Sequence, residues 1–162
     1  MLSKSVLDKL QKIENFYNKY EGSIYKHAKK IKESDYIHFK EWVRKKCPLI
    51  LDSDLEDYLD FAKIADGMNF NGLFMYSIDV EHQYNIYNYN ETWWEDPEGD
   101  DEEYFFFGHE NISWLCLNME DKQFYILDLP SGYIMEHFST FSEMMDSILN
   151  VIHFDELDGD GD

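Results

Sequence analysis

The stretch from 104 to 138 constrains the fold most, because it holds four short apolar and aromatic runs in close succession. The runs are YFFFG (104–108), ISWLCLNM (112–119), QFYILDL (123–129) and YIMEHF (133–138). The segments HEN, EDK and PSG separate them. Runs of this length, joined by connections of about two to five residues, are typical of strands in an antiparallel meander. The sequence therefore predicts a sheet in which consecutive strands pair.

Apolar residues spaced three and four apart predict helices on both sides of this region. The expected helices span 6–20, 24–47 (stopping before Pro48), 52–67 and 141–152. Ser3 or Ser5 can cap the first helix, and Thr140 or Ser139 can cap the last, where Glu143 would complete a capping box. The last helix is amphipathic, so it can cover one face of the meander.

The middle of the chain is less regular. LFMYSI (73–78) predicts a buried strand, whereas 81–95 is compatible with either a short strand or a turn of helix. The run DPEGDDEE (96–103) has no apolar residue to bury, which predicts a solvated loop, and 155–162 reads as a disordered acidic tail. No linker or repeat divides the rest, so 1–154 is expected to form a single domain.

Charge is distributed very unevenly along the chain. Residues 1–48 hold 12 Lys and Arg against 6 Asp and Glu, a net charge of +6, whereas 49–162 hold 2 against 28, a net charge of −26. The domain is thus expected to have a basic helical part at 1–48 and an acidic core at 49–154. Its net charge of −20 disfavours nucleic acids and anionic membranes as partners and speeds encounter with a basic protein.

Other sequence features indicate a cytoplasmic protein. The start, MLSKSVLDKLQKIENF, lacks the apolar core and cleavage site of a secretory signal, and no apolar run approaches the roughly 20 residues that cross a bilayer. Cys47 and Cys116 are too few and too far apart for a disulfide framework or a metal-binding cysteine pair. Cys116 alternates within an apolar run, which predicts a small buried side chain.

Catalytic motifs are scarce. His109 beside Glu110 could exchange protons or bind a metal, but both fall in the predicted HEN connection and read as turn residues. No phosphate-binding loop, nucleophile elbow or metal-ligand spacing is present among the histidines and cysteines. A trio of Ser131, His137 and Asp128 lacks any sign of an activated serine. We therefore expect no catalytic residues, no metal and no cofactor.

Aromatic and acidic residues lie together before the meander, which predicts a protein-binding surface. Tyr and Trp contribute large contact areas with few rotatable bonds, and neighbouring carboxylates can pair with Lys and Arg of a partner. The alternative is that the indoles complete the core beneath a loop. The predicted contact residues are Trp93, Trp94, Asp96, Glu98, Asp100, Asp101, Glu102 and Glu103.

Several short motifs of the chain form a recognisable set. Tyr58 and Phe61 precede Asp66-Gly67, a predicted strand ends in Phe107-Gly108, and residues 139–149 form the predicted closing helix. This set resembles the SUKH superfamily, which includes bacterial immunity proteins and the fungal Smi/Knr regulators, with Asp66-Gly67 as a variant of the family's asparagine-glycine stop. The resemblance covers 48–152 and is nearest to the YrhA-like bacterial branch. Residues 1–47 have no counterpart in it, and only Pro48 represents the proline-rich entry to the core.

The resemblance implies an α+β fold, with a twisted antiparallel sheet flanked by N-terminal helices and a C-terminal helix, and no enzymatic activity. It also implies an immunity protein that binds a cognate polymorphic toxin, such as a basic nuclease, and blocks its active site. Two alternatives stay open at this point. One is a regulatory or scaffold protein with an endogenous protein partner, and the other is a small hydrolase that uses His109 and Glu110. The sequence leaves the oligomeric state undetermined.

Overall fold

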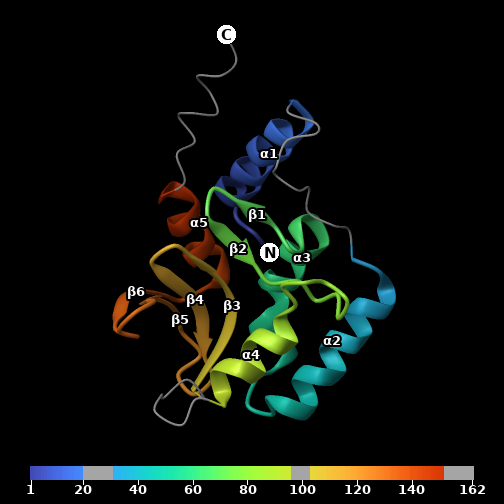
Figure 1. The fold of residues 1–162 in the computed structure, drawn as a ribbon, viewed down its shortest axis with the longest axis vertical. Coiled ribbons are helices and arrows are strands. Elements are labelled where there is room, and N and C mark those ends of the chain that lie inside the picture. The colour runs from blue at the N-terminus through green and yellow to red at the C-terminus, as the bar shows by residue number, and fades with distance from the viewer. Residues whose placement is uncertain (20–30, 96–102, 152–162) are drawn as a thin grey trace.

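A six-stranded antiparallel sheet forms the centre of the computed structural model, which describes residues 1–19, 31–95 and 103–151 (Figure 1). Its strands follow chain order and are β1 (Asn69–Phe70), β2 (Leu73–Met75), β3 (Tyr104–Glu110), β4 (Ser113–Asn118), β5 (Phe124–Asp128) and β6 (Ile134–Phe138). Each strand pairs antiparallel with the next. The predicted meander and the α+β class are confirmed. The sequence did not predict β1, which adds a small hairpin through Asn71 and Gly72, both with positive φ.

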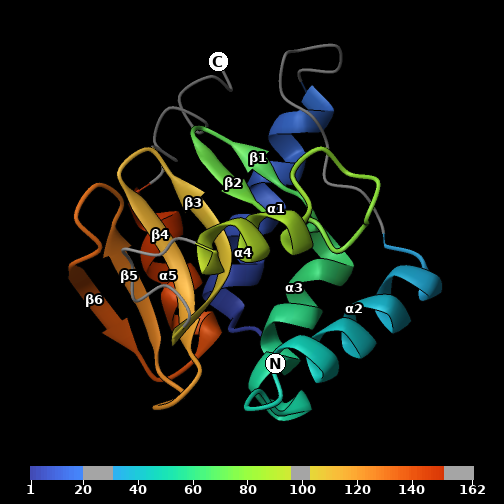
Figure 2. The ribbon, with the colours of Figure 1, turned by 60° about the horizontal axis from the view of Figure 1, so that its bottom comes forward.

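Helices flank the sheet. They are α1 (Lys4–Lys19), α2 (Glu33–Lys46), α3 (Glu56–Ala65) after a 3-10 turn (Asp52–Leu55), α4 (Ile86–Trp94) and α5 (Phe141–Val151). Figure 2 shows α5 behind the strands, where it contacts β5 and β6, and α4 in front of them beside β3. The stretch 81–95, compatible with strand or helix in sequence, is thus a loop followed by α4. The predictions for 24–30 and for the acidic tail at 155–162 lie outside the described residues.

Local hydrogen bonds explain where two of the helices begin. The Ser3 hydroxyl accepts a hydrogen bond from the backbone N–H of Val6 (3.2 Å), so Ser3 caps α1. At α5, the Thr140 hydroxyl accepts from the N–H of Glu143 (3.1 Å). The Glu143 carboxylate in turn accepts from the N–H of Ser139 (3.3 Å). Both predicted caps are confirmed, and they fix the register of the two helices that pack against each other.

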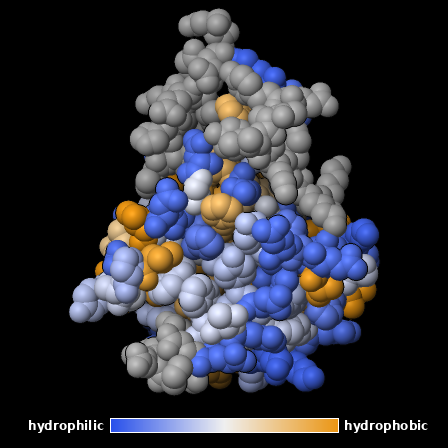
Figure 3. Space-filling model, viewed as in Figure 1, coloured by the Kyte–Doolittle hydropathy of each residue, from blue (hydrophilic) through white to orange (hydrophobic). Residues whose placement is uncertain are grey.

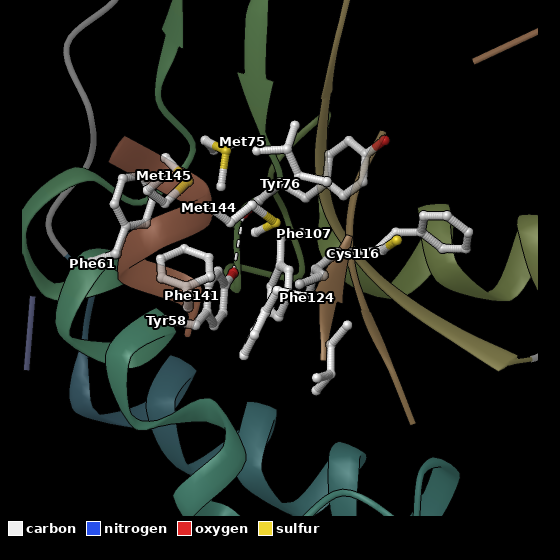
Figure 4. Close-up of a cluster of buried hydrophobic side chains, with 14 of the residues drawn as sticks. Tyr58, Phe61, Met75, Tyr76, Phe107, Cys116, Phe124, Phe141, Met144 and Met145 are labelled. Carbon is white, nitrogen blue, oxygen red and sulfur yellow. Dashed lines mark hydrogen bonds between the residues drawn. The ribbon is translucent and has the colours of Figure 1, made fainter. Parts of the chain in front are cut away.

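Aromatic rings fill the core between the sheet and helices α3 and α5 (Figure 4). The Phe107 ring lies 4.8 Å from Tyr58 and 5.1 Å from Phe141, measured between centroids. The buried Tyr58 hydroxyl donates to the backbone carbonyl of Tyr76 (3.3 Å), so its polar end is satisfied. Cys116 is fully buried, as predicted. The resemblance motif Tyr58, Phe61 and Phe107 is therefore a set of core residues.

The basic N-terminal part packs against the acidic remainder, which the sequence left undecided. Val6, Leu10 and Ile13 of α1 are buried in the core. At its margin, Lys9 forms an ion pair with Asp146 of α5 (2.6 Å), and this contact lowers the pKa of Asp146. Residues 1–19 are thus an integral part of the domain.

Gly108 lies where β2 and β3 approach each other most closely. A Cβ atom at this position would be 2.5 Å from the backbone carbonyl oxygen of Phe74 and 2.9 Å from the Met75 sulfur. β3 also bulges against β4 between Phe106 and Gly108. Glycine is therefore required here by space rather than by its backbone conformation.

We predict that Gly108→Ala lowers the free energy of unfolding by about 3 kcal/mol, because a backbone carbonyl cannot move aside as a flexible side chain can. Gly132→Ala is the comparison: its φ is +74°, but nothing lies within 4 Å of the added Cβ. Its cost should be about 1 kcal/mol, from backbone conformation alone. Urea unfolding measures both. Equal losses in the two variants would contradict the close approach of β2 to β3.

Candidate binding surface

The predicted contact residues fall around the end of α4 and the start of β3. Trp93 and Trp94 form the last turn of α4, and both indoles are half-buried against the core. Glu103 is exposed directly before β3, and its carbonyl accepts a hydrogen bond from Met119 (2.8 Å). The other predicted contacts, Asp96, Glu98, Asp100, Asp101 and Glu102, lie outside the described residues.

Trp94 links the elements on either side of the acidic run 96–103, which are α4 and β3. Its indole N–H donates to the backbone carbonyl of Tyr104 (2.8 Å), so the end of α4 is fastened to the start of β3. Its ring also stacks on Trp42 of α2, with centroids 5.7 Å apart and planes 11° apart. The Trp42 indole N–H donates to Glu91 of α4 (3.3 Å). These contacts hold the indole rigidly while leaving part of it accessible.

Trp93 packs against the sheet. Its ring lies 5.1 Å from Trp114 of β4 and 6.4 Å from Phe106 of β3. Both indoles thus serve the fold as well as the surface. This agrees with the alternative that tryptophans complete the core beneath a loop, and it leaves their partly accessible faces as the candidate contact area.

Asn90 holds α4 beside β3. Beyond the end of β2, the Asn90 side chain accepts a hydrogen bond from the backbone N–H of Phe106 (2.7 Å) and donates to its carbonyl (2.9 Å). The amide side chain of Asn90 therefore makes the two backbone hydrogen bonds to Phe106 that a neighbouring strand would otherwise make. Because Asn90 is fully buried, this pairing fixes how far along β3 the two tryptophans lie.

A buried carboxylate organises the loop that leads into α4. Asp66, at the end of α3, accepts hydrogen bonds from the Ser77 hydroxyl (2.6 Å) and the Ile78 backbone N–H (3.0 Å). Ser77 bridges to Asn85, whose side chain caps α4 by accepting from Asn88 (2.9 Å). Burial raises the pKa of Asp66 from 3.8 to about 6. The Asp66-Gly67 motif thus positions α4 through this loop.

We predict that Asp66 makes the stability of the protein depend on pH. Its carboxyl holds a proton more tightly when folded than when unfolded, so the free energy of unfolding falls as pH rises from about 4 to about 6. The loss is up to about 3 kcal/mol and stays at higher pH. Asp66→Asn should remove this component while keeping an acceptor for Ile78.

Urea unfolding across this pH range measures the free energy of unfolding of the wild type and of Asp66→Asn. The difference between the two values cancels the contribution of the other carboxylates, because both proteins have them. Parallel pH profiles for the two proteins would contradict the prediction, because they would show that the pKa of Asp66 is the same in the folded and unfolded states.

The prediction that His109 and Glu110 occupy a turn is wrong, because both belong to β3. Alternation along a strand turns neighbouring side chains to opposite faces. His109 lies among rings, stacked on Phe74 (5.3 Å) and joined by Nδ1 to the Tyr76 hydroxyl (2.8 Å). Burial lowers the pKa of His109. Glu110 instead accepts from the Ser113 hydroxyl (2.6 Å), so each side chain has a separate structural role.

The other candidate catalytic groups do not converge. Ser131 donates its hydroxyl to Asp128 (2.6 Å) within the turn between β5 and β6, whereas His137 lies on β6 beside the Tyr125 ring (6.3 Å). In the part of the chain that the structure describes, no group of three or more His, Cys, Asp or Glu residues could hold a metal ion.

Sequence reasoning missed two parts of this surface. Trp42 was assigned only to a basic helix, although it stacks on Trp94, which lies 52 positions later in the chain. No sequence pattern predicts the role of Asn90, because this role depends on hydrogen bonds to β3.

No family model matches the chain, and neither a curated protein nor a solved structure matches it. Over the described residues, no helix combines the length and apolar character that a membrane span requires.

Proposed function

We propose that this chain is a SUKH-type bacterial immunity protein that neutralises a cognate basic toxin, such as a nuclease domain, by binding over its active site. The observation that carries the proposal is the rigid aromatic surface at the end of α4. There, Trp42 stacks on Trp94 and donates to Glu91, and the exposed Glu95 directly follows Trp94 in the chain.

Rigidity supports binding through this surface. An indole that is already fixed by a stacked partner and a hydrogen bond loses little conformational freedom when a partner covers it. Trp94 has both restraints, because it stacks on Trp42 and donates to Tyr104. Its exposed part can therefore act as an anchor at small entropic cost.

Charge supports a basic partner. Residues 49–162 carry 28 acidic and 2 basic side chains, and the acidic run 96–103 connects the tryptophans to β3. Carboxylates at the rim of an interface speed association with a cationic surface, whereas buried aromatic residues slow dissociation. A nuclease that grips phosphates with Lys and Arg presents such a surface. The proposed contacts are Trp93, Trp94, Asp96, Glu98, Asp100, Asp101, Glu102 and Glu103.

We predict that replacing Asp100, Asp101, Glu102 and Glu103 with Asn and Gln removes protection against the toxin that we expect an adjacent reading frame to encode. The association rate constant should fall about tenfold or more at low salt and lose much of its salt dependence, because long-range attraction is reduced. Survival of toxin-expressing cells and stopped-flow binding to the purified toxin domain measure the two effects.

A matched control removes four exposed carboxylates elsewhere, by Asp8→Asn, Glu33→Gln, Glu41→Gln and Glu56→Gln. This variant has the same net charge as the test variant, so it should protect the cells if the position of the charges matters. Equal behaviour of the two variants would reject the proposed contact surface. Failure of the unaltered protein to bind the neighbouring toxin would reject immunity and favour an endogenous partner.

A further inference from the structure

The two edges of the sheet are finished in different ways. At one edge, β1 has only two residues, and the Tyr17 hydroxyl of α1 donates to the backbone carbonyl of Asn69. At the other edge, β6 has five residues and pairs with β5 alone within the described sheet. Within 1–19, 31–95 and 103–151, a side chain therefore covers part of the β1 edge, whereas no strand pairs with the outer side of β6 (Figure 1).

The open edge is apolar. Tyr133, Ile134 and Met135 are 77%, 57% and 49% exposed, and Ile112 in the neighbouring turn is 57% exposed. A backbone hydrogen bond from Leu129 to Ile112 (2.8 Å) joins the two turns, so these side chains belong to one end of the sheet. Figure 3 shows hydrophobic residues gathered on this side of the molecule.

Two of the usual protections of an edge strand, lysine and proline, are missing from β6. Proteins commonly guard such strands with lysine, proline or a strong bulge, because an open edge recruits further strands. The run 133–138, YIMEHF, contains no Lys, Arg or Pro. Its single register shift, opposite Ile126 and Leu127, leaves pairing intact on both sides of the irregularity. An edge of this length without lysine or proline suits the addition of an extended segment.

The charge around β6 determines which segment fits. Residues 103–151 carry eight Asp and Glu against one Lys, and that residue, Lys122, is paired with Asp54 (2.8 Å). A second copy of the chain would bring the same carboxylates together, and each copy has a net charge of −20. An extended segment in which Lys or Arg alternates with apolar residues fits better. Its basic side chains can pair with the carboxylates, and its apolar side chains can pack on the apolar residues of the edge.

We infer that β6 is a docking edge for a basic, extended segment of another protein, which adds a seventh strand to the sheet. The backbone of β6 supplies the main-chain hydrogen bonds, and Ile134 and Met135 supply apolar contacts. The inference concerns a surface separate from the tryptophans of α4, and it holds whether or not the partner is a toxin.

The test uses the full chain labelled with 15N and a short peptide in which arginine and valine alternate. NMR titration should show amide shifts concentrated at 133–138, with an affinity that falls as salt is added. The same peptide with N-methyl groups on alternate residues along one edge keeps its charge and side chains but loses hydrogen bonds, so it should not bind. A glutamate-valine peptide should not bind either.

The variant Ile134→Lys with Met135→Lys should weaken peptide binding by about tenfold or more, because it places positive charge on the docking edge. Both side chains are largely exposed, so the thermal midpoint should change little. Leu51→Lys with Val80→Lys is the matched control, because Leu51 and Val80 are 61% and 50% exposed and also lie in the acidic part of the chain. It should leave binding unchanged.

Amide shifts confined to other regions, or equal binding of the acidic or N-methylated peptide, would overturn the inference. Dimerisation of the protein alone through β6, detected by analytical ultracentrifugation at high salt, would instead assign the edge to a second copy. Neither result bears on toxin protection, because the peptide and the four-carboxylate variant probe different surfaces.

Discussion

The burial of β3 on both faces is the constraint on which the rest of the structure depends. Phe105 and Phe107 face the rings of α2, α3 and α5, whereas Phe106 faces Trp93 and Trp114. All three phenylalanines are fully buried. A sheet with one face in solvent could not bury all three, so other elements must pack on both faces of this strand. Helix α4 and its tryptophans provide the second cover, and the candidate surface therefore arises from a requirement of the core.

This origin explains why the surface is rigid. Asn90 completes the hydrogen bonding of Phe106 where β2 ends, and Trp94 fastens the last turn of α4 to Tyr104. The helix is thus joined to one strand at two points along its length. A contact surface built on such a helix keeps its shape before a partner arrives, which favours affinity through preorganisation.

Much of the fold could be predicted from periodicity, because the four long strands and the capped helices obey local rules. The failures share one cause, which is dependence on distant partners. His109 and Glu110 resemble turn residues, but His109 extends the strand because Phe74 and Tyr76 provide a ring-lined place for it. The polar and aromatic sequence of α4 is ambiguous until Asn90 meets β3. Composition predicts the acidic contacts, most of which lie outside the described residues, whereas no local pattern predicts the stacking of Trp42 on Trp94.

The uneven charge of the chain has different consequences for its two parts. In the N-terminal part, ion pairs such as Lys9 with Asp146 are internal, so part of the positive charge is used to join α1 to α5. Along 103–151, eight carboxylates stand against one lysine, and Lys9 of α1 pairs with one of them, Asp146, so an excess of negative charge remains in this part of the chain. Repulsion between copies then opposes edge-to-edge pairing of β6 with itself, even without lysine or proline as a guard. Negative charge can therefore prevent the β6 strands of two copies from pairing, a role that lysine or proline has in other edge strands. The same charge leaves β6 available to a basic segment.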